Sequence, residues 1–194
     1  NCVLRFFNEA ATEPSVEEIY VTLYRVASDS KIVNALISAA KNGKKVFVLV
    51  ELKARFDEAN NIKWANKMKD AGVEIIYSVT ALKVHAKIAL VKRKVNLRSV
   101  YTGLFSTGNF NETTANFYTD HILMTAHQEM LREMELVFMF LAKRVKPTNA
   151  DLIKFKFLLV AQFNLLPCFI SLIDREIENA KNGQPASIIV KLNN

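Results

Sequence analysis

Apolar runs alternate with amphipathic stretches along most of the chain. The run at 45–52, KVFVLVEL, is almost continuously apolar, which is typical of a strand covered on both faces. Segments 19–26 and 73–79 are rich in β-branched and aromatic residues and predict two more strands. Stretches with helical spacing lie between them at 31–41 and 57–71, and a glycine follows each. This alternation predicts an α/β fold, with helices packed on the faces of a sheet.

The remaining elements extend the alternation to the end of the chain. We expect a helix at 3–10, strands at 86–91 and 100–105 joined by a basic loop, a helix at 129–142, a strand at 155–161, a helix at 165–180 and a strand from 187. The uncharged stretch 157–173 is short for a membrane span and contains polar residues, so it predicts a buried strand followed by a helix. Because the chain starts at Asn1 and stops inside an apparent strand, we expect a fragment of a longer protein.

The composition and net charge of the chain limit the kinds of binding partner but do not identify one. Hydrophobic residues make up 51% and charged residues 23% of 194 residues, an ordinary globular balance. Lysine and arginine number 26 against 19 acidic residues, so the net charge is +7. This excess favours a polyanion such as a nucleotide, polyphosphate, nucleic acid or anionic lipid, but a solvated basic surface explains it equally well. Cys2 and Cys168 lie far apart and form no disulfide framework or metal motif.

Three side chains with phosphate-binding chemistry recur at one spacing. Arg25, Arg55 and His85 are 30 residues apart, which is the length of one strand–helix unit. Parallel strands end at the same edge of a sheet, so these side chains would gather where α/β sheets bind ligands. Two guanidinium groups and an imidazole there would bind phosphate. Alternatively, the arginines form ordinary ion pairs, for example with Glu51 or Glu58.

Two short motifs follow the third and fifth predicted strands. In His85-Ala86-Lys87, which opens an apolar strand, the histidine and lysine share a face. An imidazole is a nucleophile at neutral pH, and an ammonium group neutralises phosphoryl oxygens. The turn at 106–113, STGNFNET, offers backbone amides and the side chains of Thr107, Asn109 and Asn111 to an anion. Each motif alone occurs by chance, and the pair is more specific.

The pairing of these motifs resembles the phospholipase D superfamily, in which a histidine attacks phosphorus. That pattern has an aspartate five positions after the lysine, where this chain has Lys92, so the phosphodiesterase motif is incomplete. Longer runs resemble the polyphosphate kinase family of the long bacterial type. These runs are LYRVA at 23–27, VELKARFDE at 50–58, LKVHAK at 82–87, TGNFNE at 107–112, YTD at 118–120 and DREI at 174–177.

The family resemblance implies a fold and a reaction. It implies a phospholipase D-like sheet flanked by helices at 1–149, the first C-terminal catalytic domain. It also implies that 150–194 is the opening strand–helix–strand of a second, truncated domain of the same type. The reaction is reversible transfer of the ATP γ-phosphate to polyphosphate through a phosphohistidine at His85, with Lys87 as the second catalytic residue. Tyr118 matches a nucleotide-contacting tyrosine, and Arg25 and Arg55 match a magnesium–phosphate site in which they hold Mg²⁺ indirectly, through phosphate.

The resemblance also implies the wider setting of the protein. Partners are ATP or ADP and inorganic polyphosphate, with Mg²⁺ as cofactor and no nucleic acid. The full-length protein is expected to be a cytoplasmic homo-oligomer, with peripheral membrane association as a family expectation, and the isolated fragment is expected to be weakly active or inactive. Ser106 replaces a glycine of the family, and 161–168 is more apolar than the family's basic stretch, which puts a phosphate contact there in doubt. A phospholipase D-like phosphodiesterase or nuclease and a non-catalytic polyanion-binding module stay open as alternatives.

Overall fold

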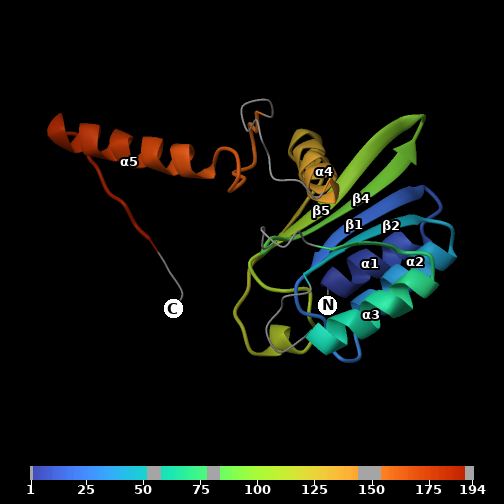
Figure 1. Ribbon diagram of the computed structural model, residues 1–194. Coiled ribbons are helices and arrows are strands. Elements are labelled where there is room, and N and C mark those ends of the chain that lie inside the picture. The colour runs from blue at the N-terminus through green and yellow to red at the C-terminus, as the bar shows by residue number, and fades with distance from the viewer. Residues whose placement is uncertain (1, 52–57, 78–83, 144–153, 191–194) are drawn as a thin grey trace. The chain divides into compact units, whose positions relative to one another are not determined.

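A six-stranded mixed sheet forms the centre of the first of two units. The computed structural model describes residues 2–51, 58–77, 84–143 and 154–190 (Figure 1). The chain divides into Asn1–Lys146 and Pro147–Asn194. In the first unit the strand order is β3-β2-β1-β4-β5-β6. The strands are β1 (Val16–Leu23), β2 (Lys45–Val50), β3 (Glu74–Tyr77), β4 (Lys87–Val95), β5 (Arg98–Ser106) and β6 (Ile122–Thr125).

The two halves of the sheet differ in strand direction. β1, β2 and β3 are parallel, whereas β4, β5 and β6 pair antiparallel with their neighbours. The predicted basic loop after residue 91 is wrong, because Lys92, Arg93 and Lys94 lie within β4. The true connection is Asn96-Leu97, whose φ angles of 48° and 64° fit the two-residue hairpin turn that matches strand twist. β6 escaped prediction because it has only four residues.

Helices cover both faces of this sheet. α1 (Cys2–Thr12), α2 (Lys31–Lys41) and α3 (Glu58–Asp70) lie on one face and α4 (Gln128–Ala142) on the other (Figure 1). α2 begins where predicted, because the Ser30 hydroxyl accepts a hydrogen bond from the Val33 amide at 3.1 Å. It ends at Asn42, and Gly43 follows with a φ of 81° that few other residues adopt.

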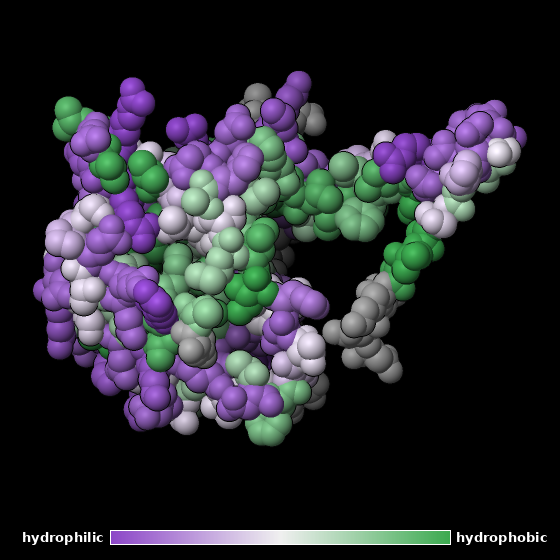
Figure 2. Space-filling model, turned by 180° about the vertical axis from the view of Figure 1, so that it is seen from behind, coloured by the Kyte–Doolittle hydropathy of each residue, from purple (hydrophilic) through white to green (hydrophobic). Residues whose placement is uncertain are grey.

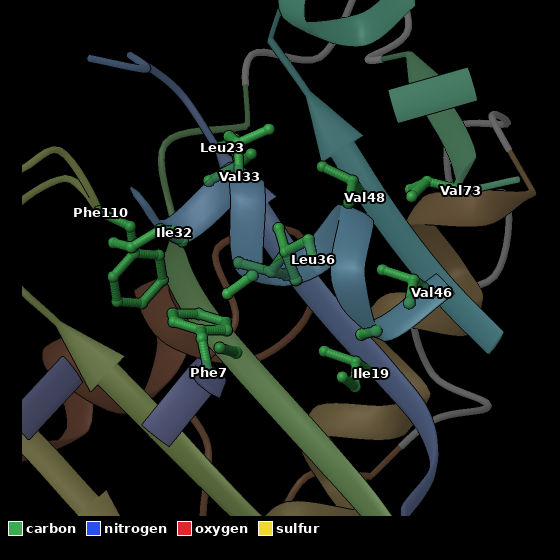
Figure 3. Packing of buried hydrophobic residues seen from close by; sticks show 14 of the residues in the cluster. Phe7, Ile19, Leu23, Ile32, Val33, Leu36, Val46, Val48, Val73 and Phe110 are labelled. Carbon is green, nitrogen blue, oxygen red and sulfur yellow. The ribbon is translucent and has the colours of Figure 1, made fainter. Parts of the chain in front are cut away.

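The main core lies between the sheet and the three helices α1–α3. Alternate residues of β1 and β2 point into it and meet Phe7, Val33 and Leu36 from the helices (Figure 3). Phe7 also contacts Phe110, whose ring centroid lies 5.8 Å away in an edge-to-face arrangement. Phe110 belongs to the 106–113 turn, so this turn is anchored in the core.

A polar cluster ties α4 to the opposite face. The Lys92 ammonium lies 3.0 Å from a Glu135 oxygen and 3.6 Å from Glu18, and the Tyr101 hydroxyl donates to Glu135 at 2.9 Å. Burial alone would lower the pKa of Lys92, but the hydrogen bond and charges of Glu135 and Glu18 outweigh it and raise the pKa above its ordinary value. Beside this cluster, Tyr20 stacks on Phe47 with ring centroids 4.6 Å apart.

The second unit contains one regular element, α5 (Leu165–Lys181), among its described residues. The prediction of this helix is confirmed, but the predicted strands at 155–161 and from 187 are wrong for the residues described there. A strand needs a neighbour to bond its amides and carbonyls, and the described part of this unit supplies none. The predicted burial of the strand at 155–161 is also wrong, because none of the described residues 154–161 is buried. No helix within the described ranges is long and apolar enough to cross a membrane.

Candidate active site

The segment after β1 carries Tyr24 and Arg25, and α3 holds it in place. The buried Asn61 amide donates to the Tyr24 carbonyl at 3.0 Å and to the Glu51 carbonyl at 3.1 Å. The Asn60 amide donates to the Val26 carbonyl at 2.7 Å, and the Trp64 indole nitrogen donates to the Ala27 carbonyl at 2.9 Å. Three side chains of one helix therefore fix the backbone that presents Arg25.

His85 lies beside this segment, as its spacing from Arg25 predicts. Its exposed ring meets the Tyr24 ring edge-to-face, with centroids 5.2 Å apart and planes at 77°. The preceding amide, of Val84, donates to the side chain of Glu51 at 3.2 Å, and this glutamate is only 1% exposed. Glu51, at the carboxyl end of β2, thus holds the backbone immediately before His85. The histidine precedes β4 by two residues rather than opening the strand.

Lys87 is buried against the same tyrosine. Its ammonium group lies 5.2 Å from the Tyr24 ring centroid and donates to the His85 carbonyl at 2.5 Å. The Arg25 guanidinium lies 6.0 Å from that centroid, so Tyr24 contacts all three groups. Burial and the charge of Arg25 lower the pKa of Lys87 to about 8, and the charge of Asp120 partly offsets them. Phosphate oxygens would favour the charged form of this lysine.

The 106–108 turn is braced by hydrogen bonds to residues 120 and 121. The Thr107 amide donates to the His121 carbonyl at 3.0 Å, and the Thr107 hydroxyl donates to Asp120 at 3.3 Å. The Ser106 hydroxyl accepts from the Gly108 amide at 3.1 Å. A Cβ on Gly108 would overlap the Asp120 carboxylate, so a larger residue at this position would displace that side chain.

The rest of the turn is anchored to α2 and to the Arg25 segment. Asn111 is buried, accepts from the Thr113 and Thr114 amides at 3.0 Å each, and lies with its amide nitrogen 3.4 Å from the Arg25 carbonyl. Glu112 accepts from the Ser30 hydroxyl at 3.2 Å and from the Ile32 amide at 2.9 Å. These bonds bring the turn to the same edge of the sheet as Arg25.

The structure gathers several of the predicted site residues. Arg25, His85 and Lys87 surround Tyr24, and Asn111 links the turn carrying Thr107 and Asn109 to the Arg25 segment. The Asn109 side-chain oxygen is buried and has no hydrogen-bond partner within the described ranges. Tyr118 is 69% exposed and therefore accessible to a ligand. Arg55 lies outside the described residues.

Sequence reasoning missed the residues that support this site. Tyr24 stands beside Arg25 in the motif LYRVA, and Asp120 ends the motif YTD, so each had a visible signal. The sequence offers Glu51 as an ion-pair partner for an arginine, and in the structure its side chain also accepts a hydrogen bond from the Val84 amide. Asn61 had no local signal, because its partners lie 10 and 37 residues away.

The donor set of the site suits phosphate oxygens better than a metal ion. Arg25 and Lys87 are cations without a lone pair to donate, and the turn adds amide groups. Within the described ranges, no group of three or more histidine, cysteine, aspartate or glutamate side chains is placed to hold a metal. The described residues of the site are therefore better suited to binding phosphate oxygens than to enclosing a metal ion.

Comparisons with known proteins agree in sequence and in structure. Residues 1–147 match the family model described as polyphosphate kinase C-terminal domain 1. The chain is 45% identical over 192 residues to polyphosphate kinase of Escherichia coli (strain K12), covering 99% of this chain and 27% of that protein. It is 44% identical over 186 residues to the enzyme of Vibrio cholerae, covering 96% and 26%. The chain thus spans about a quarter of the length of these curated relatives.

Solved structures give the same relationship. The crystal structure of polyphosphate kinase from Porphyromonas gingivalis matches with a TM-score of 0.79 and 46% identity, over 93% of this chain and 29% of that chain. The phospholipase D family member Nuc from Salmonella typhimurium matches with a TM-score of 0.56 and 14% identity, over 72% and 86%, which shows a shared fold alone. The sheet is therefore of the phospholipase D type, and the chain belongs to the polyphosphate kinase family.

Proposed function

We propose that this chain is the part of a full-length polyphosphate kinase that carries its phosphorylated histidine, His85. The reaction would transfer the γ-phosphate of ATP to polyphosphate, reversibly. The observation that supports this proposal best is the arrangement around Tyr24, where an exposed imidazole stands beside two cationic side chains. Phosphoryl transfer requires little beyond a positioned nucleophile and neutralised oxygens, and this arrangement supplies both.

In the first step a ring nitrogen of His85 attacks the γ-phosphorus. A nitrogen–phosphorus bond forms while the bond to the bridging oxygen breaks, and ADP leaves with that electron pair. Lys87 and Arg25 stabilise the negative charge on the phosphoryl oxygens, and the amides of the 107–111 turn add hydrogen bonds. Neutral His85 is the reactive form, because only an unprotonated nitrogen has a lone pair to donate.

In the second step the terminal phosphate oxygen of polyphosphate attacks phosphohistidine. The nitrogen–phosphorus bond breaks, the chain gains one phosphate and His85 is regenerated. One phosphoanhydride is broken and one is formed over the cycle, so the reverse reaction is also expected. Tyr118 is proposed to contact the nucleotide, and Arg55 to bind phosphate, with Mg²⁺ entering on the phosphate oxygens. Homo-oligomer formation, a cytoplasmic location and peripheral membrane association stay predictions from the family resemblance.

Labelling the full-length protein with γ-labelled ATP and Mg²⁺ tests the role of His85. The parent protein should acquire an acid-labile, base-stable label, and His85→Gln should acquire none. His127→Asn is a matched control, because His127 caps α4 by accepting from the Met130 amide at 3.2 Å and asparagine caps helices equally well. Equal labelling of parent and His85→Gln would refute the proposal.

The shared fold makes a phospholipase D-like diesterase the second candidate. The position of Lys92 speaks against it, because this residue replaces the expected aspartate and forms ion pairs with Glu18 and Glu135 under α4. Diester hydrolysis without ATP, lost in His85→Gln, would support the diesterase. If the protein acquires no label from ATP, and the parent and His85→Gln bind polyphosphate equally, the result would instead support a non-catalytic binding module.

A further inference from the structure

The first half of β5 has an open side. Among the described strands, β6 pairs with residues 103–106 of β5, whereas residues 98–102 pair with β4 alone. At Tyr101 the side chain of Gln128, the first residue of α4, forms the backbone hydrogen bonds that a neighbouring strand would otherwise form. It donates to the Tyr101 carbonyl at 2.9 Å and accepts from the Tyr101 amide at 2.9 Å. Backbone groups alternate in direction along an antiparallel strand, so the amide of Ser99 points to the same open side.

A hollow of about 520 Å³ lies at this open side, between β5 and α4. It is lined by Arg98, Ser99, Val100, Tyr101, Gln128 and Arg132. Tyr101 and Gln128 are committed to each other and to the polar cluster under α4. The Ser99 hydroxyl also hydrogen-bonds the Tyr101 side chain. The groups left to meet a ligand are therefore the two arginines and the Ser99 amide.

Both arginines are exposed and available to an anion. Within the ranges that the structure describes, neither the Arg98 nor the Arg132 side chain makes an ion pair or hydrogen bond. Glu135, one turn along α4 from Arg132, is already bonded to Lys92 and Tyr101. Guanidinium groups bind phosphate through two parallel hydrogen bonds, and the backbone amide of Ser99 adds one more donor.

The hollow is remote from His85. Lys87 pairs with Ser106 at one end of the β4–β5 hairpin, and Val95 pairs with Arg98 at the other. Eight residue steps along β5 at about 3.4 Å each separate these ends by roughly 27 Å. A ligand that engages both places must be a long, flexible polyanion.

We propose that the Arg98–Arg132 hollow binds the phosphates of a long polyphosphate chain away from the transfer site. The choice of ligand rests on the proposed function, while the anion site itself rests on the hollow and its arginines. A chain held at two places returns to the transfer site more readily than a chain held at one, because the second contact is intramolecular. The hollow should therefore favour long chains over short ones.

Arginine modification in the full-length protein maps the site without measuring activity. Phenylglyoxal should modify Arg98 and Arg132, and long-chain polyphosphate should slow both reactions about fivefold or more, as measured by peptide mass spectrometry. Tripolyphosphate or ATP at the same phosphate concentration should protect them much less. Arg5, whose side chain is 79% exposed on α1, is the internal control and should be unaffected by polyphosphate.

Charge-reversal variants test the consequence for chain length. Arg98→Glu and Arg132→Glu should raise the KM for long polyphosphate about five- to tenfold and leave the KM for short chains unchanged. Arg5→Glu makes the same change in net charge elsewhere and should have no effect. The lysine variants should recover only part of the loss, because an ammonium lacks the guanidinium fork.

Three results of the modification experiment would overturn the inference. These are the absence of protection, equal protection by tripolyphosphate, and stronger protection by a single-stranded oligonucleotide of matched charge. Unchanged KM values in both glutamate variants would also overturn it. Failure of the proposed function can be distinguished from failure of this inference. If the protein forms no phosphohistidine but long polyphosphate still protects the two arginines, the anion site stands and the proposed function fails.

Discussion

At the scale of single residues, two lysines of β4 occupy opposite electrostatic environments. Lys87 is 6% exposed, and burial with the Arg25 charge lowers its pKa from 10.5 to about 8. Discounted for solvent screening, this shift corresponds to about 1–3 kcal/mol of unfavourable free energy for the charged form in the folded state. Lys92 has two carboxylate partners that raise its pKa. One lysine is therefore kept at a cost in stability, and the other contributes stability.

Lys87→Met should stabilise the chain and abolish phosphohistidine formation. The folded state holds Lys87 charged below about pH 8 and the unfolded state holds it charged up to about pH 10.5, so the penalty is fully present at pH 7. We expect the free energy of unfolding in urea to rise by about 1–3 kcal/mol at pH 7, with the gain shrinking between pH 8 and pH 10. A variant that is less stable than the parent at pH 7 would contradict this.

Lys92→Met is the matched control for this prediction. It removes the same charge from the same strand but leaves Glu18 and Glu135 without their cation, so it should lower the free energy of unfolding by roughly 1–3 kcal/mol. Opposite signs for the two substitutions would confirm that pairing, rather than lysine content, decides the outcome.

At this scale the proximity of Arg25 and His85 was predictable from the sequence, whereas part of their support was not. The 30-residue spacing of Arg25 and His85 follows from the length of a strand–helix unit, and parallel strands convert that spacing into proximity. Asn61 and Glu51 act through backbone groups distant in sequence, which no local pattern reveals. Asn111 is predicted to contact phosphate. In the structure its side chain forms hydrogen bonds within the turn, and its amide nitrogen lies 3.4 Å from the Arg25 carbonyl. Its contact with phosphate stays a prediction.

At the scale of elements, α3 acts as a clamp on the segment after β1. Asn61→Ala removes one donor from two carbonyls at once, those of Tyr24 and Glu51, in a fully buried place. We expect it to lower the free energy of unfolding by about 2–3 kcal/mol and to raise the KM for ATP, because Arg25 loses its fixed backbone. Asn60→Ala removes one bond, to Val26, and should cost about 1 kcal/mol. Equal costs in urea unfolding would argue against the clamp.

Elements were predictable where their own hydrophobic pattern decides them. The buried run at 45–52 gave β2, and the amphipathic pattern at 129–142 gave α4. The hairpin β4–β5 ran further than predicted because cross-strand pairing carries the charged residues 92–94 inside the sheet. The apolar segment 155–161 forms no strand within the described part of its unit, because strand formation depends on a partner that the segment's own composition does not supply.

At the scale of the whole molecule, the two units differ in what stabilises them. All buried hydrophobic residues of the described chain lie in the first unit, between Phe6 and Phe138. In the second unit α5 carries apolar side chains at helical spacing, and they are exposed: Leu166, Phe169, Ile170, Ile173 and Ile177. Figure 2 shows apolar residues bordered by hydrophilic ones on one face of the molecule. Exposed apolar stripes of this kind are typical of elements that pack against another surface.

Separate expression of the two units tests this difference. Residues 1–146 contain the complete core, so we expect their free energy of unfolding to lie within about 1 kcal/mol of the value for the 194-residue chain. Trp64, the single tryptophan and 5% exposed, reports this unfolding by fluorescence. Residues 147–194 alone should show little helix by far-UV circular dichroism, because a 17-residue helix without a packed face is marginal in water. A cooperative helical signal from residues 147–194, or a large loss of stability in residues 1–146, would show that the second unit contributes to the stability of the fold. The expected outcome would mean that the edge of the sheet carrying Arg25, His85 and Lys87 is built and stabilised by the first unit alone.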